Sequence, residues 1–122
     1  MQQNKTYPIV CLEHISLSTR RIQEYIDGLD LGEFKMNYMV VDAVLRNFEI
    51  IEYACKGVPQ SIKEKHPNIP WATMSKLKGK KPHNLFNTNH EVAWELATKQ
   101  LPKNQKDLLE IIEQYVDENF AH

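Results

Sequence analysis

The sequence predicts an all-α fold, an antiparallel bundle of four to six helices that forms a single domain over residues 1–122. Apolar residues recur every three or four positions through most of the chain, which is the pattern of amphipathic helices. Stretches of alternating apolar and polar residues, which would indicate strands, do not occur over any length. With 42% hydrophobic and 25% charged residues, a chain of this size can bury one core without a disulfide or a structural metal.

Two long helices are predicted in the first half of the chain. The first covers Pro8 to Leu29, because the proline suits a first helical turn and a glycine lies near the end of the range. Its His14 is expected to be partly buried and hydrogen-bonded. The second runs from Val41 to a stop at Gly57–Pro59, and its strong apolar periodicity marks it as the central helix.

Short helices are predicted after the central one. Residues Ser61 to Lys65 can form one turn of helix. Another helix enters at Ile69–Trp71, where a proline at the first turn costs no hydrogen bond. This helix is expected to be short or broken, because Gly79 and Pro82 both lie inside it.

The last part of the chain predicts two further helices. Asn87–Asn89 forms a turn that caps a helix, and helical spacing resumes from Glu91 to Lys99. Leu101-Pro102 is expected to break this helix. The final helix has a mostly acidic outer face, and its opposite face carries the apolar residues Leu108, Ile111, Ile112, Tyr115, Val116 and Phe120.

The charge balance excludes a protein that attracts polyanions with its whole surface. The formal net charge is −1 at pH 7, so attraction to nucleic acid or acidic lipid must come from a local cluster. No apolar run approaches the roughly 20 residues that a membrane span needs, and the start of the chain carries no targeting signal. We therefore expect a cytoplasmic protein with no membrane partner.

No cofactor or metal site is predicted. None of the five histidines is followed, three or four residues later, by a second histidine or a cysteine, and no His-Glu-x-x-His or Cys-x-x-Cys pattern occurs. The four glycines are scattered singly, which excludes a Gly-rich phosphate loop. Cys11 and Cys55 have apolar neighbours at helical spacing and are predicted as small core residues in a reducing compartment.

The chemically distinctive stretch is the basic segment from Lys76 to His83. Four lysines and one histidine fall within eight positions, between the apolar anchors Trp71 and Phe86. Cations hold phosphates and a histidine moves protons near neutral pH, which together suit cleavage of RNA through its own 2′-hydroxyl. A solvated charge run that aids solubility is the alternative, and composition leaves both open.

Three other stretches add a specific pattern. They are DAVLRNFEII at Asp42–Ile51, HPNIPW at His66–Trp71 and EVAW at Glu91–Trp94. As a set, in this order and spacing, they resemble the HepT-like family of the HEPN superfamily. The resemblance covers nearly the whole chain, from His14 to the acidic last helix.

This resemblance implies a HEPN-like bundle that forms a homodimer. It also implies a ribonuclease toxin that acts on RNA and whose antitoxin partner is a minimal nucleotidyltransferase. The family's catalytic motif is Arg-x-x-x-x-His-x-Tyr, placed shortly after the Pro-Trp pair. Its Arg and His serve a metal-independent cleavage, its Tyr receives AMP from the partner, and the two motifs of a dimer converge on one cleft.

Carried onto this chain, the family histidine matches His83, which would be the general acid/base. The arginine position falls on Lys78, which would be the cation that holds the phosphate, with four residues between them as the motif requires. Lys80 and Lys81 would bind RNA through electrostatic attraction.

The other motif positions depart from the family. Gly79 stands where Asn is common, and Leu85 stands at the tyrosine position and has no hydroxyl to accept AMP. Lys78 cannot grip a phosphate with two parallel hydrogen bonds as Arg does. Pro82 would bend the helix that aims the catalytic pair. A rival hypothesis is therefore a catalytically inactive HepT-like module that binds a partner protein or a nucleotide.

Two polar residues on the central helix have two possible roles. Asp42 and Arg46 are spaced to pair along the helix, and Arg46 and Asn47 lie among apolar neighbours. They can form a buried polar link that fixes helix packing. Alternatively, Arg46 and Asn47 line the dimer cleft opposite His83 and bind substrate.

Overall fold

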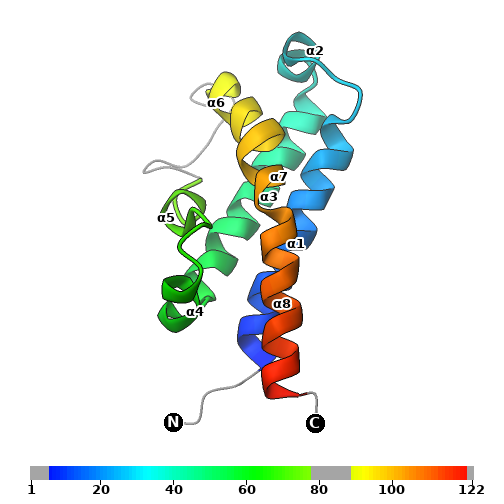
Figure 1. Cartoon of the computed structure of the whole chain (residues 1–122). Helices are drawn as coiled ribbons and strands as arrows, with labels where there is room; N and C mark the ends of the chain where they lie inside the picture. Colours follow the sequence, from blue (N-terminus) through cyan, green and yellow to red (C-terminus); the bar gives the residue numbers. More distant parts are fainter. Residues whose placement is uncertain (1–5, 78–88, 121–122) are drawn as a thin grey trace.

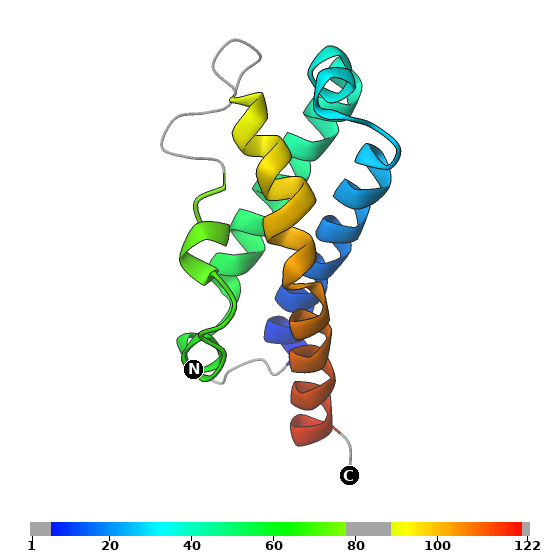
Figure 2. The ribbon, with the colours of Figure 1, turned by 45° about the horizontal axis from the view of Figure 1, so that its top comes forward.

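The computed structural model describes residues 6–77 and 89–120, and these form helices joined by short turns, with no strand among them. The all-α class predicted from the sequence is confirmed. Figure 1 shows α1 (Thr6–Ile26) and α3 (Tyr38–Gly57) side by side. Figures 1 and 2 show a long column, which runs from α6 (His90–Glu95) into α8 (Gln105–Asn119), lying across this pair.

The packed pair of α1 and α3 supplies most of the core, as the periodicity predicted. Both helices bury one apolar stripe, and both cysteines are free thiols within it. Helix α1 stops at Ile26, three residues earlier than predicted, because Gly28 takes a left-handed conformation with φ of 78°. The fully buried apolar side chains of the pair include Leu12, Ile15, Ile22, Val41, Val44 and Ile51.

Helix α2 (Leu31–Met36) was not predicted from the apolar pattern. A capping box starts it: Oδ1 of Asp30 accepts a hydrogen bond from the amide of Glu33 at 2.8 Å, and Oε1 of Glu33 accepts one from the amide of Asp30 at 3.0 Å. The helix buries Phe34 completely, and this ring lies 5.2 Å from that of Trp94. The short helix therefore closes one end of the bundle.

An ion pair joins this end to α6. Nζ of Lys35 donates to Oε1 of Glu91 at 2.9 Å. The hydrogen bond and the positive charge of Lys35 lower the pKa of Glu91 below its ordinary value.

Helices α4 (Gln60–Lys65) and α5 (Trp71–Met74) follow the central helix as predicted. Trp71 is buried, and its indole N–H donates to the carbonyl of His66 at 2.9 Å. Residue Leu77 is also buried. The chain is described again from Asn89, whose side chain accepts from the amide of Val92 at 3.0 Å and caps α6 as expected.

The prediction that Leu101-Pro102 breaks the helix is wrong. The chain stays helical from α6 through η1 (Leu96–Gln100), a π-helical turn, and α7 (Leu101–Lys103). A proline removes one α-helical hydrogen bond and crowds the carbonyl four residues earlier. The π turn, in which the amide of Leu101 donates to the carbonyl of Leu96, widens the backbone at this point and accommodates the ring.

Helix α8 packs its apolar stripe against α1. Leu108 and Ile111 are buried, and Nε2 of Gln105 donates to the carbonyl of Ser16 at 3.0 Å. Within the described ranges, no helix is both long enough and apolar enough to cross a membrane.

A glycine at the end of α3 leaves room for two side chains of α1. A β-carbon built on Gly57 would lie 2.6 Å from Sγ of Cys11 and 2.8 Å from the hydroxyl of Tyr7. The side-chain hydrogen bond between these two residues raises the pKa of the Tyr7 hydroxyl. A larger residue at position 57 would therefore have to displace the side chains of Cys11 and Tyr7.

We expect Gly57→Ala to lower the free energy of unfolding by about 1–2 kcal/mol because of this overlap, although alanine is the better helix former. Urea denaturation followed by circular dichroism measures the change. In a double-mutant cycle, Cys11→Ala should make Gly57→Ala less costly, because it removes the nearest atom. Strictly additive effects would show that the two side chains do not compete for this space.

Candidate functional site

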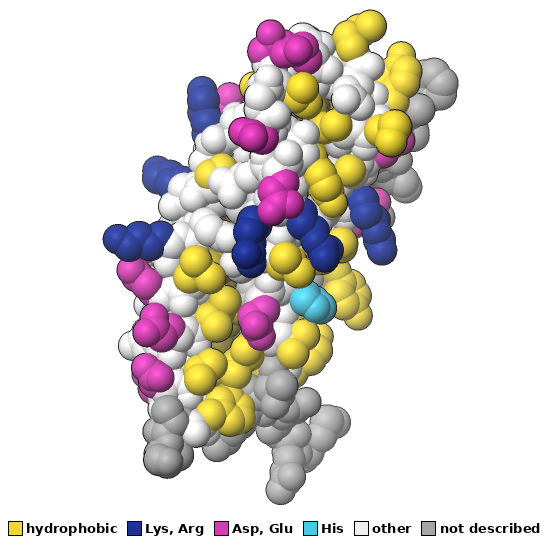
Figure 3. All heavy atoms as spheres, turned by 90° about the vertical axis from the view of Figure 1, so that its right-hand side faces the viewer, with side chains coloured by type: hydrophobic (Ala, Val, Ile, Leu, Met, Phe, Trp, Pro, Cys, Tyr) yellow, Lys and Arg dark blue, Asp and Glu magenta, His cyan; other side chains and the backbone are white. Residues whose placement is uncertain are grey.

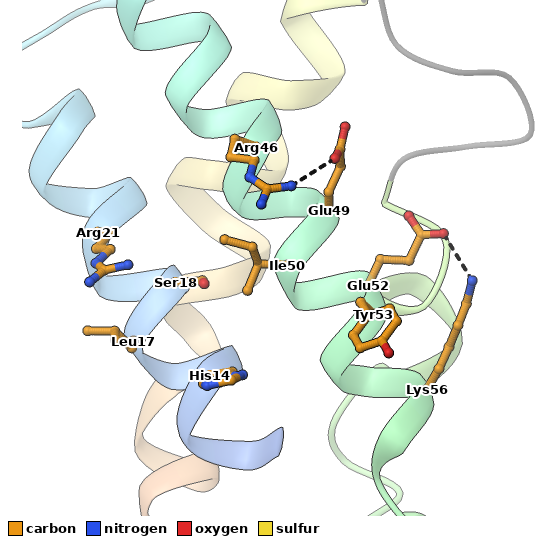
Figure 4. A pocket seen from close by; sticks show the side chains of 10 residues that line it. All are labelled: His14, Leu17, Ser18, Arg21, Arg46, Glu49, Ile50, Glu52, Tyr53 and Lys56. Atoms are coloured by element: carbon orange, nitrogen blue, oxygen red, sulfur yellow. Dashed lines mark hydrogen bonds and ion pairs between the residues drawn. The ribbon is translucent and has the colours of Figure 1, made fainter. Parts of the chain in front are cut away.

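A groove of about 750 Å³ runs between the outer faces of α1 and α3. Figure 4 shows the side chains of both helices that line it. The lining residues are His14, Leu17, Ser18 and Arg21 from α1, and Arg46, Glu49, Ile50, Glu52, Tyr53 and Lys56 from α3.

Helical periodicity brings these residues together. His14, Leu17 and Arg21 are spaced by three and four residues, so they share one face of α1. Arg46, Tyr53 and the residues between them that face outward do the same on α3. The other face of each helix is buried in the core. The two polar stripes therefore lie at the surface, where they line the groove.

The groove carries more positive than negative charge. Nη1 of Arg46 lies 3.4 Å from Oε2 of Glu49, and Nζ of Lys56 lies 3.3 Å from Oε1 of Glu52. Arg21 forms no ion pair with another residue of the described ranges. Figure 4 shows both glutamates, and Lys56 beside Glu52, on the side of α3 that faces away from α1, which leaves Arg21 and Arg46 as the charged side chains nearer to α1.

His14 and Tyr53 are both exposed at this groove. The expectation that His14 is partly buried and hydrogen-bonded is wrong: its side chain lies in the solvent-facing stripe of α1. His14 is exposed because it shares the face of α1 with the exposed Leu17, whereas Leu12 and Ile15 lie on the buried face. Tyr53 is 77% exposed, which is unusual for an aromatic ring.

The polar link predicted for Arg46 is not formed. The side chain of Arg46 is 71% exposed and pairs with Glu49, not with Asp42. Arg46 lies on the groove face of α3, where its side chain reaches solvent and needs no buried partner. For this reason it does not form the predicted pair with Asp42. Arg46 therefore lies at a surface groove, as the alternative role requires.

Asn47 lies on the buried side of α3. It is 5% exposed, and its Nδ2 donates to the carbonyl of Ala43 at 2.9 Å. Its Oδ1 has no hydrogen-bond partner among the described residues. The structure thus places Arg46 and Asn47 on different sides of the helix, and only Arg46 lines the groove.

The predicted catalytic segment lies outside the described residues. Lys78, Lys80, Lys81 and His83 all fall between residues 78 and 88. Of the basic segment, the described part is Lys76, which is exposed, and Leu77, which is buried. The roles of the other four residues stay predictions.

Sequence reasoning did not single out Arg21, Lys56 and Tyr53. These residues have no motif of their own, and they become a set only when α1 and α3 are paired in the right register. A signal was present in the stripe of Arg46, Tyr53 and Lys56, because an exposed aromatic between two cations on one helix face is a candidate binding surface.

A second groove lies on the other side of α1, against α8. Its volume is about 440 Å³, and its lining includes the apolar residues Val10, Leu17, Leu109 and Ile112 together with Glu13 and Arg20. Figure 3 shows that hydrophobic side chains run along this side of the molecule, with Lys and Arg side chains near the middle.

The thiols and the acidic residues offer no further chemical site. Burial raises the pKa of Cys55, whose Sγ lies 3.4 Å from the carbonyl of Trp71, and this favours the unreactive thiol. In the part of the chain that the structure describes, no group of His, Cys, Asp and Glu could hold a metal ion.

Comparison with known proteins identifies relatives over most of the chain. A family model described as "Ribonuclease HepT-like" matches residues 15–115. A protein of Caldanaerobacter subterraneus that is assigned as an RNase is 30% identical over 102 residues, which is 84% of this chain and 91% of the relative.

Two archaeal relatives agree with this match. A Methanocaldococcus jannaschii protein that is assigned as an RNase is 31% identical, over 75% of each chain. A Thermococcus cleftensis protein that is assigned as ribonuclease HepT is also 31% identical, over 75% of this chain and 83% of the relative. No solved structure gives a significant match.

Proposed function

The chain belongs to the HepT-like ribonuclease family, and on this premise we propose that it is a metal-independent endoribonuclease of the toxin type, restrained by a nucleotidyltransferase antitoxin. The observation that supports the activity most strongly is the family match over residues 15–115, which contains the whole Lys76–His83 segment. The relatives assigned as RNases support the same class of reaction.

The proposed chemistry uses the substrate's own nucleophile. His83 takes the proton of a ribose 2′-hydroxyl, whose oxygen attacks the adjacent phosphorus while the bond to the 5′-oxygen breaks. Lys78 stabilises the charge that develops on the phosphate oxygens, and Lys80 and Lys81 attract the RNA backbone. The departing 5′-oxygen takes up a proton, returned by His83 or supplied by water, so the products are a 2′,3′-cyclic phosphate and a free 5′-hydroxyl.

The proposal places the protein in the cytoplasm and gives the antitoxin a different point of control. Leu85 replaces the family tyrosine, and a leucine cannot be joined to AMP. Restraint by a nucleotidyltransferase would therefore use another residue or binding alone. The rival function, an inactive interaction or nucleotide-binding module, is favoured by the combined presence of Gly79, Pro82 and Leu85.

A homodimer is part of the proposal, and the outer face of α1 supports it. Leu17 is exposed on this face, with Glu13 four residues before it and Arg20 three residues after it. When two copies of α1 meet antiparallel around a twofold axis near Leu17, Glu13 of one copy lies opposite Arg20 of the other. The apolar Val10 and Leu109 beside them would be covered in the same contact.

We expect His83→Ala to reduce cleavage of total RNA by about 10²–10⁴-fold, because general acid–base catalysis contributes this much. Gel electrophoresis of RNA incubated with purified parent and variant measures the loss. Cleavage that persists at the parent rate in His83→Ala would reject the assigned role. A parent without any cleavage would favour the inactive module.

Lys78→Arg tests the phosphate-holding role separately. Arginine restores the family residue and can donate two parallel hydrogen bonds to the phosphate, so cleavage should rise about tenfold. Lys99→Arg makes the same change at an exposed helix position outside both grooves and should leave the rate unchanged. Equal rates in the parent and Lys78→Arg would remove Lys78 from the catalytic pair.

Sedimentation velocity tests the dimer contact. Either Glu13→Arg or Arg20→Glu alone places like charges opposite each other and should weaken the dimer by about tenfold or more. The combined exchange, Glu13→Arg with Arg20→Glu, restores the pairing and should recover the dimer. A combined variant that stays monomeric would contradict this arrangement, and a monomeric parent would contradict the dimer itself.

A further inference from the structure

From the α1–α3 groove we infer that a single-stranded RNA segment binds between these helices, with its phosphates on Arg21 and Arg46 and one base on Tyr53. This inference rests on the proposed ribonuclease function and adds a substrate-binding surface that contains none of the catalytic residues. Three observations carry it: the placement of the cations, the availability of their donors, and the exposed aromatic ring.

The cations come from both walls of one groove. Arg21 on α1 and Arg46 on α3 both line it, and Figure 4 shows Lys56 farther along α3, beside Glu52. A protein with a formal net charge of −1 can attract an RNA backbone only where cations gather locally. The described acidic residues of the last helix lie outside this groove.

The two arginines have donors available for phosphate. Arg46 uses one nitrogen in a 3.4 Å contact with Glu49, and 71% of its side chain is exposed. The long contact with Glu49 occupies only Nη1 of Arg46, so the other guanidinium nitrogens can bind a phosphate. Lys56 pairs at 3.3 Å with Glu52, whose side chain is only 13% exposed, so this lysine stays beside a carboxylate at the edge of the groove. Arg21 has no ion-pair partner among the described residues.

Glu49 and Glu52 do not block the path of the strand. Figure 4 shows them on the side of α3 that is turned away from α1, whereas Arg21, Leu17 and His14 form the opposite wall. The two carboxylates therefore flank the groove and leave its α1 side basic. A strand that follows this side meets cations before it meets either glutamate.

Tyr53 supplies a surface on which a base can stack. Its ring is 77% exposed and lies between the cationic positions of α3, close to Lys56 in Figure 4. Basic grooves with exposed aromatic rings are the common solution for single-stranded nucleic acid, and stacking tolerates any base. The groove volume of about 750 Å³ is in the range of sites that hold small organic ligands, so one nucleotide with its flanking phosphates fits.

The experiment measures binding without cleavage. All variants are made in the full chain that carries His83→Ala, and fluorescence anisotropy reports their affinity for a short, fluorescein-labelled, single-stranded oligouridylate. Arg21→Glu with Arg46→Glu should weaken binding by about tenfold or more. It should also reduce the slope of log affinity against log salt by about 0.7 for each phosphate that the variant no longer neutralises.

Lys99→Glu is the matched control. Its side chain is also 71% exposed and also pairs with a glutamate along its own helix, Glu95, at 3.2 Å. It makes the same charge change per residue outside the groove, so it should change affinity less than about twofold. An equal loss of affinity in Lys99→Glu would show that only net charge matters, and would overturn the inference.

Substitution of the ring tests the base position. Tyr53→Ala should weaken binding by about tenfold, whereas Tyr53→Phe keeps the ring and should bind as the parent does. Equal binding by all three proteins would remove Tyr53 from the site. Sedimentation velocity must show that Arg21→Glu with Arg46→Glu has the same mass as the parent. If this variant loses RNA binding only because it loses the dimer, the groove is a contact between copies of the chain and the inference is overturned.

The two proposals fail in different ways. Groove-dependent binding by a protein that never cleaves RNA would reject the ribonuclease and keep the groove. Cleavage that depends on His83 but is unaffected in rate and affinity by Arg21→Glu with Arg46→Glu would keep the ribonuclease and reject the groove. A protein that binds no RNA at all would reject the groove.

Discussion

The close packing of α1 against α3 is the constraint on which the rest of the structure depends. It buries the apolar stripes of both helices, and at the end of α3 Gly57 leaves room for the side chains of Cys11 and Tyr7. Because each helix can bury only one stripe, the opposite stripe of each is left at the surface. The groove with its cations is therefore a direct result of how the core is formed, since its residues belong to the two helices that cannot move apart without exposing that core.

Sequence patterns predicted the long elements well, because long periodic stretches leave few alternatives. The all-α class, helices α1 and α3, and the cap at Asn89 were all predicted correctly. Helix α2 was missed because six residues give too short a period, although the Asp30–Glu33 capping box was present in the sequence. The break at Pro102 was predicted wrongly, because a rule for α-helices does not foresee a π turn that relieves the proline.

The candidate site shows a different balance between sequence and structure. The Lys76–His83 segment could be identified from its residues, because a motif is a local pattern, but its residues from 78 onward lie outside those that the structure describes. The groove is the reverse case. Arg21 and Arg46 are 25 positions apart in the sequence, and only the register of the two helices brings them to one space. The burial of Asn47 next to the exposed Arg46 shows that adjacent polar residues on a helix need not share a role.

The contact between the first and the last long helices has a consequence for synthesis of the protein on the ribosome. The side-chain amide of Gln105 donates to the carbonyl of Ser16, so α1 is covered by a helix that is made much later. Until α8 has left the ribosome, nascent α1 keeps an apolar stripe uncovered, and the bundle cannot close. Closure of the bundle is thus coupled to synthesis of α8, and a product that terminates before α8 would expose apolar surface that the protein-quality machinery recognises.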